Sequence, residues 1–452
     1  MPQMRLSRVN LFVAFAFTVM ADPVSSVAYA IEAALRALDG DPASLVATMS
    51  LVVGIILVVS FTYHQLIGRF PRGGGGPEAV AAAFGEGWAF LPLGALLVDF
   101  TLTVAVSCSA GAAALIAYVP AVGGARLPVA LALAAVVAGG VLAGHRGRVL
   151  FALATQAFIL LAAAVVVAGA FAGPAAAPAV GAGHAAPLLA GASLPAVLAA
   201  LPLGMALATG VEAPSSAIAQ LPQLGDRGRR LFGRGTLWLM VALVGGLTIC
   251  FAALAVRLAV PLPGADSTLL AEVARASLGG GIPFAGFQAL SALLLLAAAA
   301  SSYLAGSGVL KALAGLGADG RSGLLPARLR RENRFLVAHW GVVVVFAAAV
   351  AMIVAAGGRE QRLVQFYAVS VFASFLAATL ACAWLSLAER RLAAALANLA
   401  GAALVGFVLA LNLTRLDSAI ALLASLLVAA YLWRGWVARG RPGGVVRTPA
   451  GG

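Results

Sequence analysis

Hydrophobic and polar residues of this chain are arranged in long blocks. Twelve apolar runs of about 20 residues are separated by short segments rich in arginine, glycine and proline. Because a helix rises about 1.5 Å per residue, each run is long enough to cross ~30 Å of hydrocarbon. Backbone groups in lipid must bond within their own segment, and no alternating strand pattern is present. The pattern therefore predicts an all-α polytopic membrane protein with twelve transmembrane helices.

The apolar runs also define the expected organisation of the chain. The spans are predicted at 11–37, 43–67, 88–118, 127–144, 149–171, 194–220, 235–257, 284–312, 335–356, 363–387, 392–413 and 418–437. Residues 1–171 and 194–387 are expected to form two inverted repeats of five spans, joined by a connecting loop at 172–193. Spans 11 and 12 follow at 388–437, with a tail at 438–452. The segments between spans are too short for a separate soluble domain.

The charge distribution points to a bilayer as the partner. Only 10% of residues are charged, whereas soluble domains carry about 25%. The formal charge of +13 lies in short loops between spans, which argues against a nucleic-acid partner. Counted loop by loop, 22 of the 29 Lys and Arg fall on the side that holds both termini. The positive-inside rule therefore predicts that both termini are cytoplasmic.

Familiar catalytic and cofactor motifs are missing from the sequence. Cys108, Cys250 and Cys382 lie inside apolar runs without CxxC spacing, so neither a disulfide nor a metal site is implied. The glycine run Gly73–Gly76 lacks the Gly-Lys-Ser/Thr of a phosphate-binding loop, and a flexible turn is expected there. We expect neither an enzyme nor a cofactor.

A short repeat links the two predicted halves. Asp22–Ser26 reads Asp-Pro-Val-Ser-Ser, and Glu212–Ser216, 190 residues later, reads Glu-Ala-Pro-Ser-Ser. The two copies are offset by five spans, an odd number, so the halves have opposite topology. Paired proline-interrupted spans in inverted halves are a sequence indicator of a transporter site. The prediction is that spans 1 and 6 are discontinuous near Ala21–Ser26 and Thr209–Ser216 and cross, with spans 3, 8 and 10 around them.

Three acids stand deep in predicted spans: Asp22, Asp99 and Glu212. A charge at a helix centre costs at least ~2.5 kcal/mol, so such acids are usually functional or paired. No intramembrane Lys or Arg is available to pair with them. The alternative is that an acid caps a broken helix end or stays protonated. Desolvation and neighbouring negative charge favour a protonated Glu212, which is the candidate proton carrier.

Hydroxyl groups accompany these acids at helical spacing. Thr103 and Ser107 follow Asp99 at i+4 and i+8, although both could simply bond to carbonyls four residues back. The other candidates are Ser25, Ser26, Tyr29, Thr209 and Tyr367. Hard oxygen ligands with several negative charges suit an alkali cation, whereas a transition-metal site would need imidazole or thiolate.

Several stretches resemble one family. Similarity to KimA-type potassium importers, which are KUP-related members of the amino acid–polyamine–organocation (APC) superfamily, lies in segments 22–32, 69–76, 97–107, 209–213, 301–303 with 324–326, and 366–372. The resemblance implies a LeuT-like five-plus-five inverted repeat and a homodimer. It also implies proton-coupled potassium uptake across the bacterial inner membrane. It places potassium at Asp22, Asp99 and Glu212, lined by Tyr29, Thr103, Ser107, Thr209 and Tyr367.

Two departures from that family pattern carry expectations of their own. KimA-type proteins have a C-terminal cytosolic domain that senses cyclic di-AMP, whereas this sequence ends about fifteen residues after span 12. That regulation is therefore expected to be absent or supplied by another chain. Span 8 reads Ala-Ala-Ala-Ser-Ser-Tyr where relatives tend to show Ala-Asn-Thr-Ser-Tyr, which points to a shifted substrate.

Other substrates and classes remain as alternatives. An APC-family amino acid or polyamine permease is the second interpretation. Such permeases often receive a substrate carboxylate at a glycine-rich break in the first helix. The break here is acidic and glycine-free, so it would repel a carboxylate, but a cationic amine would fit. A channel is disfavoured because no repeated filter of the Thr-Val-Gly-Tyr-Gly kind occurs.

Overall fold

The computed structural model describes residues 8–144, 147–173, 192–315 and 323–444. These residues form sixteen α-helices and five short 3₁₀ helices, with no strand among them. Twelve helical stretches are long and apolar enough to cross a membrane, so the predicted all-α class and the number of spans are confirmed.

The α-helices are α1 (Arg8–Val19), α2 (Ala21–Ala37), α3 (Pro42–Arg69), α4 (Gly75–Phe84), α5 (Phe90–Tyr118), α6 (Arg126–Leu142), α7 (Gly147–Phe171), α8 (Leu194–Gly204), α9 (Ala213–Ala217), α10 (Asp226–Arg257), α11 (Leu269–Leu278), α12 (Ile282–Leu313), α13 (His339–Ala356), α14 (Glu360–Ala388), α15 (Leu392–Leu413) and α16 (Leu416–Ala438). The 3₁₀ helices are η1 (Glu86–Ala89), η2 (Pro120–Ala125), η3 (Met205–Ala208), η4 (Ile218–Gln220) and η5 (Ala327–Arg330). Span 1 is made of α1 and α2, and span 6 of α8, η3, α9 and η4.

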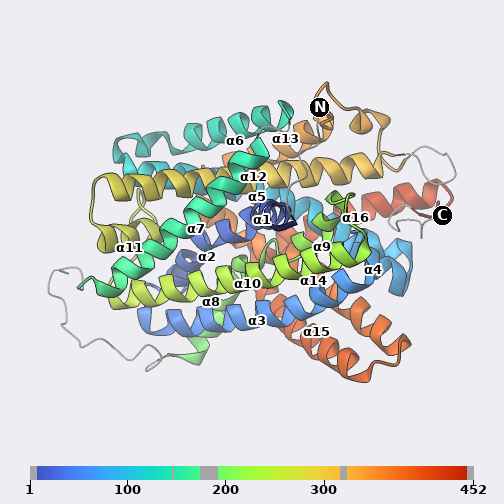
Figure 1. The fold of residues 1–452 in the computed structure, drawn as a ribbon, viewed down its shortest axis with the longest axis horizontal. Helices are drawn as coiled ribbons and strands as arrows, with labels where there is room; N and C mark the ends of the chain where they lie inside the picture. Colours follow the sequence, from blue (N-terminus) through green and yellow to red (C-terminus); the bar gives the residue numbers. More distant parts are fainter. Residues whose placement is uncertain (1–7, 145–146, 174–191, 316–322, 445–452) are drawn as a thin grey trace.

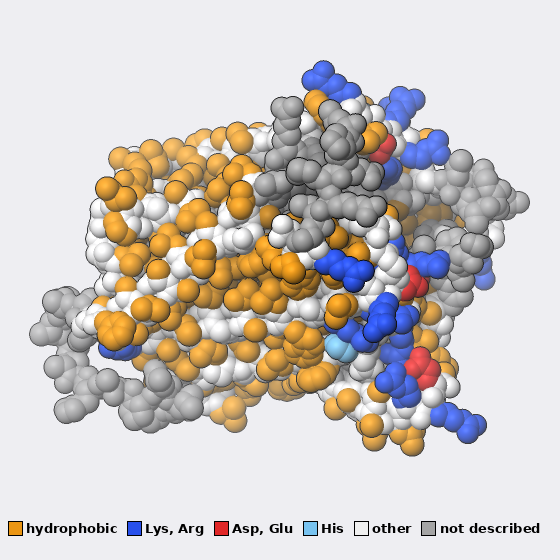
Figure 2. All heavy atoms as spheres, viewed as in Figure 1, with side chains coloured by type: hydrophobic (Ala, Val, Ile, Leu, Met, Phe, Trp, Pro, Cys, Tyr) orange, Lys and Arg blue, Asp and Glu red, His pale blue; other side chains and the backbone are white. Residues whose placement is uncertain are grey.

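Most of the long helices run along the longest axis of the molecule (Figure 1). Apolar side chains cover the middle of the face in Figure 2, whereas Lys and Arg gather toward one end. This arginine-rich end is the one where Figure 1 places α4 and α9, and α11 lies at the opposite end. The surface is therefore that of a molecule set across a bilayer.

The disturbance of span 1 is slight and lies earlier than predicted. It is at Met20, which keeps helical φ and ψ (−76° and −8°), donates to the Ala16 carbonyl and accepts from the Val24 N–H, both at 2.9 Å. Asp22–Ser26 lie within the first turns of α2 and not in a break. Pro23 explains the displacement. Proline has no N–H to donate, and its ring disturbs the carbonyl four residues earlier, which belongs to Val19, the last residue of α1. A proline thus interrupts the helix upstream of itself.

The interruption of span 6 is where the sequence predicted it, although it is shorter. Helix α8 tightens into η3, Thr209 is extended (φ −64°, ψ 142°), and the chain turns before α9 begins at Ala213. Gly210 has φ +77°, a conformation that favours glycine. A Cβ at this position would lie 2.8 Å from Cδ of Pro23. The turn in span 6 therefore packs directly against Pro23 in the first turn of α2.

Two short helices were not predicted, and one of them corrects the expectation of a flexible turn at Gly73–Gly76. Gly73, Gly74 and Gly75 all have positive φ, and α4 starts at Gly75. A Cβ at Gly73 would lie 2.7 Å from Cβ of Ala219, so this turn packs tightly against the end of span 6. The other unpredicted helix is α11. The proposed division into repeats stays a prediction, because most of the connecting loop at 172–193 lies outside the described residues.

Candidate functional site

The three intramembrane acids come from three different spans. Asp22 lies in the first turn of α2, Asp99 on α5, and Glu212 immediately before α9. They are 8%, 1% and 7% exposed, and each has one buried carboxylate oxygen without a hydrogen-bond partner. Asp99 interacts electrostatically with both other acids. Within the described part of the chain, none of the three forms an ion pair with Lys or Arg.

These acids do not form a metal-binding cage. In the described residues, no three His, Cys, Asp or Glu side chains lie close enough together to hold one metal ion. A cation bound here would therefore take at most part of its ligand shell from carboxylates. Hydroxyl and carbonyl oxygens would have to complete the shell, and the site contains both.

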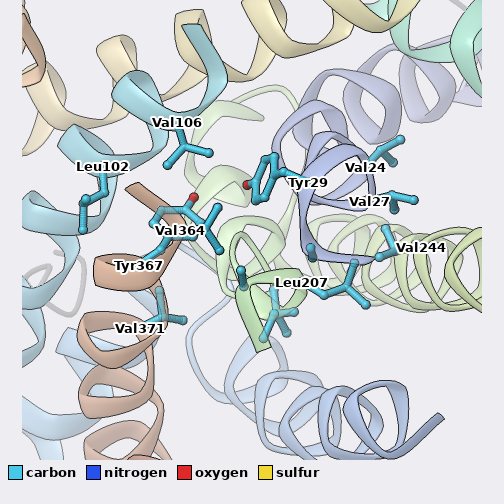
Figure 3. Close-up of a cluster of buried hydrophobic side chains, with 14 of the residues drawn as sticks. Val24, Val27, Tyr29, Leu102, Val106, Leu207, Val244, Val364, Tyr367 and Val371 are labelled. Carbon is cyan, nitrogen blue, oxygen red and sulfur yellow. The ribbon is translucent and has the colours of Figure 1, made fainter. Parts of the chain in front are cut away.

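Two buried tyrosines, Tyr29 and Tyr367, face each other across the helices that carry the acids. Figure 3 shows Tyr29 on α2 and Tyr367 on α14, with their hydroxyls facing the space between the helices. The ring centroids are 6.2 Å apart, and the Tyr367 hydroxyl is hydrogen-bonded to that of Thr103 on α5. Thr103 therefore bonds across the site and not to its own helix. One turn further along α5, the buried Ser107 hydroxyl has no partner.

Hydroxyl groups on spans 1 and 6 donate hydrogen bonds to the backbone carbonyls of the acids. Ser25 Oγ donates to the Asp22 carbonyl at 2.7 Å, and Ser215 Oγ donates to the Glu212 carbonyl at 2.6 Å. The same bond, three residues back to an acid, therefore occurs in both halves. Such bonds satisfy carbonyls that a regular helix would otherwise use.

Ser26 and Thr209 make similar local bonds. The hydroxyl of Ser26 is 2.6 Å from the Pro23 carbonyl and 3.3 Å from that of Leu207 on η3, while Thr209 donates to the Ala206 carbonyl at 3.0 Å. Ser26 therefore connects spans 1 and 6. These hydroxyl hydrogens are engaged, but their oxygen lone pairs can still face a cation.

Sequence reasoning missed one residue beside the acids. Tyr63 on α3 is 1% exposed, its hydroxyl has no hydrogen-bond partner, and it interacts electrostatically with Glu212 and Asp99. No sequence signal marked it, because Tyr63 lies near the end of the predicted span 43–67, where an aromatic residue is usually interfacial.

A second group of acids lies toward the other end of the molecule, around a small cavity lined partly by Glu32, Gln288 and Glu360. Here the charges are paired. Glu32 bonds to Arg36 Nε at 2.8 Å and to the backbone N–H of Leu269 at 2.9 Å, and Glu360 is 3.2 Å from Arg126. The contrast indicates that the unpaired acids beside Tyr63 are the ones left free for a ligand.

Comparison with known proteins agrees with this architecture. The chain is 28% identical over 364 residues to the potassium transporter KimA of Bacillus subtilis (strain 168), and the match covers 78% of this chain and 58% of that protein. The chain thus spans less than two thirds of the length of this relative. A family model described as amino acid permease matches residues 9–430. Twelve helices with interrupted spans 1 and 6 are consistent with the LeuT-like fold of the superfamily. The chain belongs to the amino acid permease family, within the APC superfamily.

Proposed function

We propose that this protein is a secondary transporter that takes up potassium by alternating access, coupled to protons. The observation that carries the proposal is the set of three buried acids, Asp22, Asp99 and Glu212, without a basic partner in the described residues. Burying such charges unpaired is costly, so they are kept for something that binds them. The relative's potassium substrate supports the same conclusion.

The chemistry of the site favours an alkali cation over a zwitterion. Its groups are carboxylates, hydroxyls and carbonyls, which are the oxygen ligands that replace a hydration shell. An amino acid would bring a carboxylate into a region that already carries three negative groups. Potassium would be held between the acids and the hydroxyls of Tyr29, Thr103 and Tyr367.

Glu212 is proposed as the proton carrier. It stands just before α9 and has a carboxylate oxygen that is buried and unpaired. Electrostatic repulsion from Asp22 and Asp99 favours binding either a proton or a cation at this position. Loading a proton from one side and releasing it to the other would couple the two movements.

The proposal also covers the orientation of the protein in the membrane and its assembly. The arginine-rich end would face the cytoplasm, with both termini on that side of a bacterial inner membrane. Residues 1–171 and 194–387 would form the inverted repeats, and two copies would associate as a homodimer.

The second candidate is an amino acid or polyamine permease, which the description of the matching family model favours. A polyamine or another cationic amine would suit the acids as well as potassium does. The two substrates differ in size. An amine is larger than a bare ion, so it must displace side chains that the ion does not touch.

One experiment separates them. A bacterial strain lacking potassium importers would be complemented with the gene, and the purified protein would be tested in proteoliposomes with rubidium as tracer for potassium, and with labelled amino acids and polyamines. We expect growth at low potassium and rubidium uptake that amines do not inhibit. Uptake of an amine without rubidium uptake would establish the permease instead.

A further inference from the structure

A phenylalanine at position 63 could make the same ring contacts as Tyr63. Its ring contacts Phe375 of α14 edge-on, with centroids 5.7 Å apart. A Cβ built on Gly76, in the first turn of α4, would lie 3.5 Å from the Tyr63 hydroxyl. The absence of a side chain at Gly76 therefore lets α4 approach this hydroxyl closely.

Nothing in the described part of the protein bonds to the Tyr63 hydroxyl oxygen. It is fully buried and has no hydrogen-bond partner. Leaving a buried hydroxyl unpaired is unfavourable, so a tyrosine at this position indicates a partner that is not part of the chain. The carboxylates of Glu212 and Asp99, which interact electrostatically with Tyr63, favour a positively charged partner. It should be a cation or a group that carries one.

The depth of Tyr63 distinguishes it from the other tyrosines. It is six residues before Arg69, which ends α3, whereas Tyr29 lies on α2 and Tyr367 on α14. The tight glycine turn that begins α4 closes this side, since a Cβ at Gly75 would lie 2.6 Å from Oγ of Ser215.

We propose that the Tyr63 hydroxyl is a cation ligand at the arginine-rich side of the site, where an alkali ion is held between Glu212 and Asp99 before release. The inference deepens the proposed function and rests on it. A phenol is neutral and binds an alkali ion more weakly than a carboxylate does. It suits the position from which the ion must depart.

The test compares Tyr63→Phe with the unsubstituted protein and with Tyr303→Phe. Tyr303 is an equally buried tyrosine, but its hydroxyl donates to the Ala134 carbonyl at 3.3 Å and so has a partner within the chain. Purified full-length protein in detergent would be heated at increasing KCl, with N-methylglucamine chloride holding the ionic strength constant. The potassium concentration that gives half of the maximal stabilisation is the quantity compared.

We expect Tyr63→Phe to require roughly 5- to 30-fold more potassium, which corresponds to about 1–2 kcal/mol, and Tyr303→Phe to respond as the unsubstituted protein does. Rubidium uptake in cells at matched membrane levels should show the same shift in KM and provides a second readout if the purified variant is unstable. An unchanged potassium response and KM for Tyr63→Phe would overturn the assignment alone. No potassium stabilisation of the unsubstituted protein would overturn both this assignment and the proposed function.

Discussion

Gly210 offers a direct test of the packing between the two interrupted spans. In Gly210→Ala, the new Cβ would lie 2.8 and 2.9 Å from Cδ and Cγ of Pro23, closer than side-chain atoms ordinarily approach. The residue would also keep φ near +77°, which costs an alanine about 1–2 kcal/mol. Overpacking against a rigid ring adds about 1–3 kcal/mol. We therefore expect a loss of roughly 2–5 kcal/mol in the free energy of unfolding, together with reduced rubidium uptake.

Two further variants divide this loss into its causes. Gly246→Ala is the matched control, because Gly246 is helical and a Cβ there meets nothing within 4 Å. In Gly210→Ala combined with Pro23→Ala, the ring contacts disappear while the φ strain remains. The free energy of unfolding would be measured by denaturation in mixed detergent micelles. Equal stability of Gly210→Ala and Gly246→Ala, or a double variant no better than Gly210→Ala, would show that the two spans are not packed as described.

The remaining predictions concern charges. Asp22→Asn and Asp99→Asn should each reduce rubidium uptake by at least about 100-fold while membrane insertion stays normal or improves, since a costly charge is removed. Near-normal uptake would exclude that acid from the site. Glu212→Gln should abolish accumulation driven by a pH gradient while retaining part of the potassium binding, and pH-driven accumulation in this variant would move the proton carrier elsewhere. Arg69 holds the pKa of Glu389 below its usual range. A depressed pKa stabilises the fold above the unfolded value near 4.5, and this contribution is lost as the pH falls through the lower folded value. Glu389→Gln should therefore lower stability at pH 7 by no more than about 1 kcal/mol, and this difference should shrink as the pH falls below 4.5, a trend that denaturation at a series of pH values would check.

Much of the fold could be predicted from the sequence because lipid allows so few structures. Length and apolarity fixed the twelve spans, and the acid–proline–serine repeat located the interruption in span 6. The error in span 1 came from treating Asp22–Ser26 as the break itself. The disturbance by Pro23 acts on the carbonyl of Val19, four residues earlier.

The candidate site was only partly predictable. Spacing along one helix placed Thr103 on the same stripe as Asp99, but its hydrogen bond to Tyr367 joins residues 264 apart in sequence. Tyr63 had no such spacing to mark it. Its significance depends on Glu212 and Asp99 arriving from other spans. Contacts of this kind belong to the packing of helices, which a pattern along one chain does not encode.

The packed glycine turn at Gly73–Gly76 also has a practical consequence for engineering the protein. Loops between membrane spans are common places to insert epitope tags or fluorescent reporters, and glycine-rich ones are usually chosen. Here, two glycine runs look alike in sequence and differ in structure. A Cβ at Gly73 or Gly75 would collide with span 6, whereas one at Gly279, Gly280 or Gly281 would meet nothing within 4 Å. A reporter is therefore better inserted at Gly279–Gly281, and the same insertion at Gly73–Gly76 would push on the span that carries Glu212.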